Sequence, residues 1–234
     1  MSSKERTIER RAFPLAELRV EEREGNPPRV VGHAAVFGRR SLPLAESGGD
    51  MLVEEIAPGA FAKTLREADV RALINHDPNL ILGRTRAGTL RLAEDDRGLA
   101  VSIDLPDTQA ARDLVVSMRR GDISQMSFAF APVRQRWTKE PAGDKTLHVR
   151  LLQEVRLFDV SVVTFPAYED TDAQVRALQA AEGVPGDLAA VLAATARAAL
   201  WGRLCEAAGV PDRPALERQL GFARELREQL RAGA

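Results

Sequence analysis

Residues 121–130 read Gly-Asp-Ile-Ser-Gln-Met-Ser-Phe-Ala-Phe, and this stretch decides how the first part of the chain folds. Gly121 ends a helical pattern, and a strand pattern follows at once. Because side chains alternate across a strand, one face carries the large apolar residues and is predicted to lie in the core: Met126, Phe128 and Phe130. The opposite face carries small residues, which a substrate chain can approach: Ser127, Ala129 and Ala131.

Ser127 interrupts the apolar pattern and is the candidate nucleophile. A serine hydroxyl is a poor nucleophile unless a base takes its proton, so this role needs an imidazole within about 3 Å. The alternative is an ordinary strand serine. The base must come from the three histidines of the chain: His33, His76 and His148.

His76 is the candidate base. Residues 70–78 read Val-Arg-Ala-Leu-Ile-Asn-His-Asp-Pro, and alternation puts His76 at the end of a strand, on the face of Val70, Ala72 and Ile74. At that position the side chain is held rigidly and stays accessible. The alternative is that His76 only helps to form an Asn-His-Asp-Pro turn.

Two acids, Glu154 and Asp159, lie in a strand-forming stretch over residues 151–168. An acid inside an apolar strand is costly to bury unless it is paired, for instance with the second nitrogen of a catalytic histidine. The alternative is an edge position or a salt bridge to Arg156 or Arg150. For Glu154 that alternative is favoured, whereas for Asp159 both interpretations stay open.

Short apolar runs separated by turn signals fill the chain before residue 172 and predict an α+β, mainly β fold. The eight predicted strands cover 30–37, 51–56, 70–75, 89–92, 99–105, 125–133, 147–152 and 155–164. Eight short strands suggest a barrel or a sandwich. Two predicted helices interrupt them, over 60–67 and 108–120.

The composition changes near residue 172, so we predict one domain over 1–171 and an α-helical C-terminal tail over 172–234. Pro185-Gly186-Asp187 opens the first tail helix and Gly209 ends it. Asp212 opens the second helix, which keeps one apolar stripe. The tail is interpreted as a docking or partner-binding segment, with a helical pair that completes the core as the alternative.

Charge and cysteine content exclude several classes of protein. The 33 basic and 34 acidic side chains nearly cancel, so no general attraction to nucleic acid or to an anionic membrane is expected. No apolar stretch approaches the roughly 20 residues of a membrane span. The single Cys205 allows no internal disulfide and no Cys/His metal spacing, and a cytosolic setting is the default.

Four motifs occur in the order seen in tailed-phage prohead proteases, which the chain resembles over about residues 7–178. They are Glu-Ile-Ala-Pro-Gly-Ala-Phe at 55–61, Asn-His-Asp at 75–77, Met-Ser-Phe-Ala-Phe at 126–130 and Asp-Val-Ser-Val-Val-Thr-Phe-Pro-Ala-Tyr at 159–168. The family is similar to the herpesvirus assemblin proteases. That similarity implies a closed β-barrel surrounded by helices. Within the first motif, we interpret Pro58 as the start of a helix and Phe61 as an anchor under the barrel, with no role in the chemistry.

The resemblance also implies the roles of the site residues. Ser127 would be the nucleophile and His76 the general base. Asp159 would orient His76, with Glu154 as the reserve for this third role. The position of Ala167 just after the strand, rather than the resemblance, predicts that its backbone N–H serves in the oxyanion hole. Neither a metal nor a cofactor is needed.

By the same resemblance, the chain would be a serine endopeptidase that acts inside the immature prohead, in the host cytoplasm. Its partners would be the major capsid protein precursor with its scaffold region, and itself through autocleavage. The herpesvirus relatives act as dimers, so a homodimer is an open option. Neither nucleic acid nor a membrane is an expected partner. The alternatives are a catalytically silent scaffold protein that binds coat subunits, and a hydrolase of non-peptide esters or amides.

Overall fold

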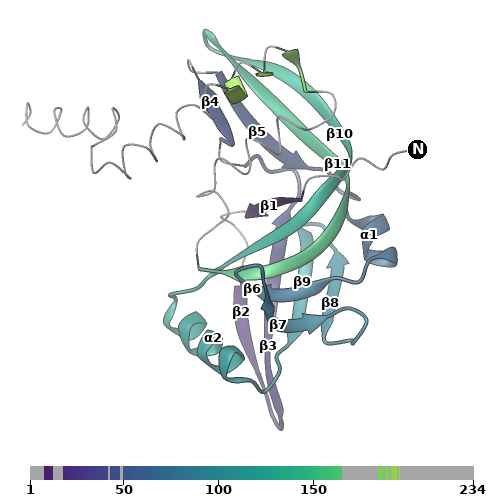
Figure 1. Ribbon diagram of the computed structural model, residues 1–234, viewed down its shortest axis with the longest axis vertical. Helices are drawn as coiled ribbons and strands as arrows, with labels where there is room; N and C mark the ends of the chain where they lie inside the picture. The colour runs from purple at the N-terminus through teal and green to yellow at the C-terminus, as the bar shows by residue number, and fades with distance from the viewer. Residues whose placement is uncertain are drawn as a thin grey trace, which may run out of the picture.

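Eleven described strands form two sheets, one of seven strands and one of four (Figure 1). The computed structural model describes residues 8–12, 18–41, 43–47, 50–164, 184–186, 188–189, 191–193 and 195. The strands are β1 Glu9–Ala12, β2 Leu18–Arg23, β3 Asn26–Val36, β4 Ala45–Ser47, β5 Asp50–Ile56, β6 Arg71–Ile74, β7 Asp77–Arg84, β8 Leu90–Glu94, β9 Gly98–Asp104, β10 Gln125–Ala142 and β11 Lys145–Val163. The helices are α1 Ala62–Glu67 and α2 Gln109–Arg120.

The long hairpin of β10 and β11 is the axis of the larger sheet and runs along most of the molecule in Figure 1. Its turn is Gly143-Asp144, and Gly143 has a φ of 70°. On its other side β11 pairs in parallel with β5 through residues 147–152 and with β6 through residues 159–162. The hairpin strand β7 follows β6, and β1 pairs with the free side of β10.

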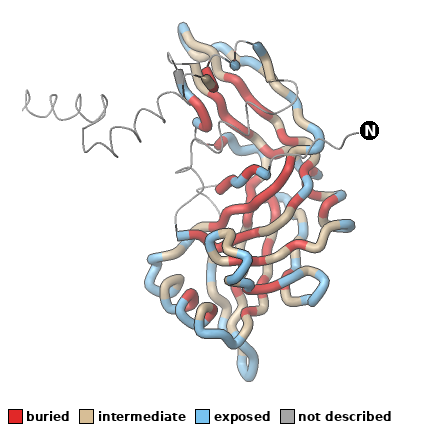
Figure 2. The backbone as a smooth tube through the Cα atoms, viewed as in Figure 1, coloured by how far each residue is buried: buried red, intermediate tan, exposed pale blue. Residues whose placement is uncertain are grey.

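The smaller sheet has the order β2-β3-β9-β8, and the main core lies between it and the larger sheet. At the start of β10 the large even-numbered residues are fully buried there, as the alternation predicts: Met126, Phe128 and Phe130. Phe61 packs edge-on against Phe128 at 5.7 Å between ring centres, so its anchoring position is confirmed. The buried backbone in Figure 2 follows this core through β3, β9 and β10.

The mainly β fold is confirmed, but a closed barrel is not found among the described residues. Closure needs two hydrogen-bonded neighbours for every strand. In the described part of the chain, β2 and β8 have one neighbour each and so end the smaller sheet. The prediction also missed β1, β2, β4 and β7, and it divided the single strand β11 into two.

The helix predicted over 108–120 is confirmed by its caps. The side chain of Thr108 accepts a hydrogen bond from the Ala111 N–H, and Gly121 ends the helix at a φ of 82°. A left-handed conformation at this position favours glycine, because a side chain there is strained. The chain therefore turns from α2 into β10 just before the candidate nucleophile.

Described residues of the first predicted tail helix contact the larger sheet. Leu188, Val191 and Leu192 pack in a second apolar cluster with residues of β4 and β5 that include Leu52. The Ala189 N–H donates to the Pro185 carbonyl, in the i to i+4 spacing of a helix. The rest of the predicted tail, including the segment predicted as its second helix, lies outside the described residues, so the helical tail and the boundary at 172 stay predictions. No helix in the described part of the chain is long and apolar enough to cross a membrane.

Gly98 allows β9 to lie close to β3, which gives a first testable prediction. A Cβ built at Gly98 would lie 2.0 Å from the carbonyl oxygen of Ala35, a backbone atom that cannot turn aside. We expect Gly98→Ala to lower the free energy of unfolding by about 1–3 kcal/mol, the usual cost of overpacking. Urea denaturation measures it. Gly25→Asn is the control, because that site is open and asparagine tolerates its φ of 69°. A cost at Gly98 no larger than at Gly25 would contradict the prediction.

Candidate active site

Ser127 lies near the start of β10, on the face of the larger sheet that points away from the main core. Its paired residue on β11 is Ser161, and its paired residue on β1 is Ala12. Ser127 exposes no surface. The strand thus holds the hydroxyl in a fixed position between two neighbouring strands.

His76 occupies the second position of the two-residue turn that joins β6 to β7. Asn75 and His76 have φ angles of 51° and 57°, the left-handed pair of a type I′ hairpin turn. The strand predicted over 70–75 therefore begins one residue later and ends at Ile74, and His76 is a turn residue rather than the last strand residue. Forming the turn and facing Ser127 are not alternatives here, because His76 does both.

The turn is tied to the end of β11 through Asn75. The Asn75 N–H donates to the Val162 carbonyl at 2.9 Å, and its side-chain oxygen accepts from the Thr164 N–H at 2.9 Å. The backbone N–H of His76 donates to the Ser161 hydroxyl at 3.2 Å. These bonds fix a turn whose positive φ angles are uncommon for non-glycine residues, although Asn and His adopt them more readily than most.

Asp159 reaches the same face because β11 contains a β-bulge. Across the β10–β11 pair, Asp159 lies opposite Ala129 while Leu157 lies opposite Phe130. Phe158 is therefore the extra residue between two consecutive positions of β10. A bulge of this kind re-aims the side chains that follow it.

The bulge changes which residues of β11 face the core. Directly before it the core residues of β11 are Val155 and Leu157, and directly after it they are Val160 and Val162, so the numbers change from odd to even. With unbroken alternation, Asp159 and Ser161 would face the core as Val155 and Leu157 do. The extra residue turns both of them toward the face that carries Ser127.

The three side chains meet in one hydrogen-bonded line. His76 Nε2 lies 2.7 Å from Ser127 Oγ, and His76 Nδ1 lies 2.6 Å from Asp159 Oδ1. An ionised carboxylate only accepts hydrogen bonds, so the ring proton belongs on Nδ1 and leaves Nε2 to accept the Ser127 proton. This arrangement can deprotonate a serine hydroxyl and stabilise the imidazolium that forms.

A family model for the caudovirus prohead serine proteases matches residues 16–184, more than half of the chain. The chain belongs to this family. The predicted resemblance to prohead proteases is thereby confirmed, and with it the function of a phage capsid maturation protease. The similarity to herpesvirus assemblin proteases stays a prediction.

A solved structure, that of the bacteriophage T4 capsid assembly protease gp21, is similar to this prohead protease at 11% sequence identity. The similarity has a TM-score of 0.45 and covers 68% of this chain and 98% of that one. No curated protein sequence matches the chain.

Glu154, the reserve for the third role, is not brought to His76 in the described structure. Glu154 lies before the bulge, and its Oε1 is 3.5 Å from Lys63 Nζ. Ala167 lies outside the described residues, so its role in the oxyanion hole stays a prediction. The described residues hold no group of three His, Cys, Asp or Glu side chains that could bind a metal ion.

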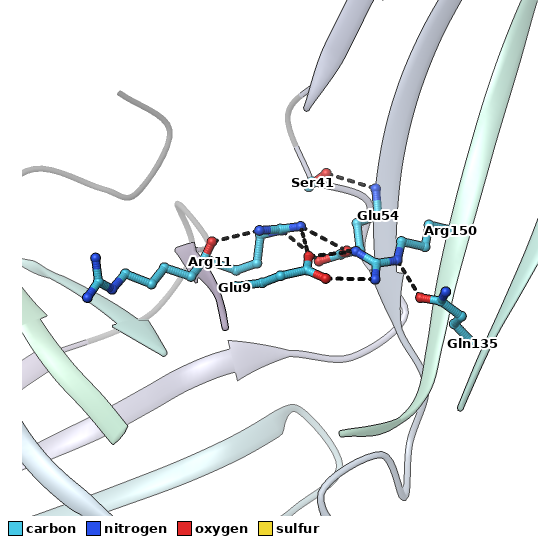
Figure 3. A network of polar contacts seen from close by, with 7 residues as sticks. Glu9, Arg11, Ser41, Glu54, Gln135 and Arg150 are labelled. Atoms are coloured by element: carbon cyan, nitrogen blue, oxygen red, sulfur yellow. Dashed lines mark hydrogen bonds and ion pairs between the residues drawn. The ribbon is translucent and has the colours of Figure 1, made fainter. Parts of the chain in front are cut away.

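A buried network of four charges holds β1 beside the strand of Ser127, and the sequence analysis did not find it (Figure 3). Arg150 Nη1 lies 2.7 Å from Glu9 Oε2 and 2.9 Å from Glu54 Oε2. Arg11 pairs with the same two carboxylates at 2.6 and 2.9 Å. Arg150 Nε also donates to Gln135 Oε1. The sequence offered Arg150 only as a partner for Glu154 or Asp159.

Proposed function

We propose that this protein is a serine endopeptidase whose nucleophile is Ser127, with His76 as base and Asp159 as the residue that orients it. One observation carries the proposal: His76 places one ring nitrogen 2.7 Å from Ser127 Oγ and the other 2.6 Å from Asp159 Oδ1. The three residues come from β10, the β6–β7 turn and β11. A catalytically silent scaffold has no need to hold them in this line.

The reaction proceeds by acyl transfer. His76 Nε2 takes the proton of the Ser127 hydroxyl while Oγ attacks the carbonyl carbon of the peptide bond. The imidazolium then gives that proton to the leaving amine, and an acyl-enzyme forms. A water molecule deprotonated by His76 hydrolyses the ester and restores Ser127. Asp159 stays ionised throughout and stabilises the imidazolium. The Ala167 N–H is proposed as a donor to the oxyanion.

The burial of Ser127 sets a condition on this reaction. Ser127 exposes no surface, and the side chain of His76 exposes only 8% of its own. A substrate carbonyl therefore reaches Oγ only after atoms around the site move.

The proposed substrates are segments of the major capsid protein precursor and its scaffold region, and the protease itself by autocleavage. The proposed place of action is the immature prohead in the host cytoplasm. Membership of the prohead protease family supports both proposals. The homodimer remains an option that oligomeric-state measurements would decide.

The test uses intact mass spectrometry on the wild-type chain mixed with the coat precursor encoded beside it. One sample is first blocked with a fluorophosphonate, which adds to activated serines. We expect cleavage in the unblocked sample only, with the added mass on the tryptic peptide that contains Ser127. An intact coat precursor under assembly conditions, with no added mass, would favour the silent scaffold. Cleavage of small esters alone would favour a non-peptide hydrolase.

A further inference from the structure

Ser161 lies at the centre of the proposed site. On β11 it pairs with Ser127 of β10 on one side and with Leu73 of β6 on the other. It exposes no surface, although it lies on the face that points away from the main core. Its position thus joins the strand of the nucleophile to the strand that leads into the turn of His76.

The hydroxyl of Ser161 makes two hydrogen bonds whose directions are fixed by chemistry. It donates to Asp159 Oδ1 at 2.8 Å, because a carboxylate only accepts. It accepts from the backbone N–H of His76 at 3.2 Å, because an N–H only donates. The same carboxylate oxygen also receives the Nδ1–H of His76 at 2.6 Å.

Together these contacts close a ring. It runs from the His76 backbone N–H through the Ser161 hydroxyl to Asp159 Oδ1, and back through Nδ1 of His76. The ring thus connects both the main chain and the side chain of His76 to the same oxygen of Asp159. Because hydrogen bonds in a chain polarise one another, the bond that Ser161 accepts from the His76 N–H strengthens the bond that it donates to Asp159.

The ring restrains two parts of the site that could otherwise move, the turn of His76 and the carboxylate of Asp159. The base sits on a two-residue turn with positive φ angles, and a turn is less rigid than the strands it joins. The second torsion of an aspartate side chain is broad, so one hydrogen bond alone leaves its carboxylate free to rotate. Ser161 restrains both movements at once.

We propose that Ser161 is a positioning residue of this protease, whose hydroxyl fixes Asp159 and the backbone of His76 in one hydrogen-bonded ring. The inference rests on the proposed function and adds a fourth residue to it. Ser161 touches neither the substrate nor Ser127 Oγ in this role. Its removal therefore affects the geometry of proton transfer rather than binding of the substrate.

The experiment compares Ser161→Ala and Ser161→Thr in the full chain, with a peptide that spans the bond cleaved in the coat precursor. We expect Ser161→Ala to lower kcat about 10- to 100-fold, the effect of a displacement of about 1 Å at a reacting group. KM should stay within about twofold of wild type, because substrate contacts are intact. Ser161→Thr keeps the hydroxyl and should restore most of kcat. Ser102→Ala, in β9 of the other sheet, is the matched control and should behave as wild type.

A second readout needs no substrate. The proton on His76 Nδ1 gives a downfield resonance in proton NMR when it is held between the ring and a carboxylate. We expect Ser161→Ala to broaden this resonance by faster exchange with water, and Ser161→Thr to retain it. This measurement keeps the inference testable if one variant has low activity for another reason.

The outcomes separate the two proposals. If the wild type cleaves nothing and takes no label on Ser127, the proposed function fails. If the wild type is active and folded Ser161→Ala matches it in kcat and in the NMR resonance, only the role of Ser161 is overturned. A loss in Ser161→Ala that folded Ser161→Thr does not restore would assign Ser161 to packing and would also overturn it.

Discussion

Ser127→Ala is expected to lower kcat/KM for the coat-derived peptide by about 10⁴-fold or more, the loss seen when a serine nucleophile is removed. Without Oγ no acyl-enzyme can form, and His76 has no proton to accept at 2.7 Å. What remains is the catalysis supplied by binding and by any oxyanion donors. Initial rates measured by quantitative mass spectrometry cover this range, and the fluorophosphonate should add no mass to the variant.

The control for Ser127→Ala is the stability of the variant. Ser127 and its paired residue Ser161 are both buried in β10 and β11, so alanine fits the space without a clash. We therefore expect the urea midpoint to change by no more than the loss of one hydrogen bond allows, about 1 kcal/mol. Cleavage by folded Ser127→Ala at a rate near that of wild type would exclude Ser127 as the nucleophile.

The sequence could identify the members of the site because each stands out from its own surroundings. Ser127 is a hydroxyl among apolar strand residues, His76 precedes Asp77-Pro78, and Asp159 is an acid between apolar residues. That these three side chains lie together could not be derived from the alternation of side chains along the strands. The bulge at Phe158 reverses the phase of β11, and no local signal in the sequence marks it.

Ser161 escaped the sequence analysis because a serine in a strand carries no sign of its partners. One of its two hydrogen bonds comes from the β6–β7 turn, which lies 85 residues away along the chain. The other goes to Asp159, which only the bulge in β11 brings to the same face. The buried pairs of Glu9 and Glu54 escaped for a similar reason. Isolated charges in a sequence look like surface residues, and only the register of β1, β5 and β11 brings them together.

Parts of the fold were nevertheless within reach of the sequence. Caps marked α2 at both ends, and alternation marked the core face of β10. Gly143-Asp144 is a recognised signal for a two-residue hairpin turn. It could have shown that β10 extends to Ala142 and that β11 begins at Lys145. The many charged and polar residues over 134–140 and 145–150 hid those extensions, because such a composition resembles a loop although it belongs to a partly exposed hairpin.

Arg150→Met is expected to cost about 3–5 kcal/mol of unfolding free energy, the usual cost of breaking a buried ion pair. The side chain of Arg150 is fully buried, and its guanidinium contacts both Glu9 and Glu54. Methionine fills a similar volume but leaves two buried carboxylates against the single charge of Arg11. Urea denaturation at about pH 7 measures the effect, and a loss below about 1 kcal/mol would contradict it.

The matched control is Arg40→Met, since Arg40 also pairs with a glutamate, Glu140, at 2.7 Å. That pair is about half exposed, so its removal should cost at most about 1 kcal/mol. Burial, not pairing itself, is what makes the difference between the two arginines. Because β1 depends on Arg150 and lies beside Ser127, Arg150→Met should also lower activity, whereas Arg40→Met should not.

A lower pH should reduce the difference in unfolding free energy between wild type and Arg150→Met. Burial raises the pKa of Glu9, but the charges and hydrogen bonds of Arg150 and Arg11 outweigh it, so this pKa lies below its ordinary value of 4.5. A carboxyl with a lowered pKa contributes stability that is present above the unfolded value and is lost as the pH falls through the folded one. Of the two charges that lower the pKa of Glu9, Arg150 has the larger effect, and Arg150→Met removes it. Wild type should therefore lose more stability than the variant below about pH 4.5, and equal losses would show that the network does not depend on the ionisation of Glu9.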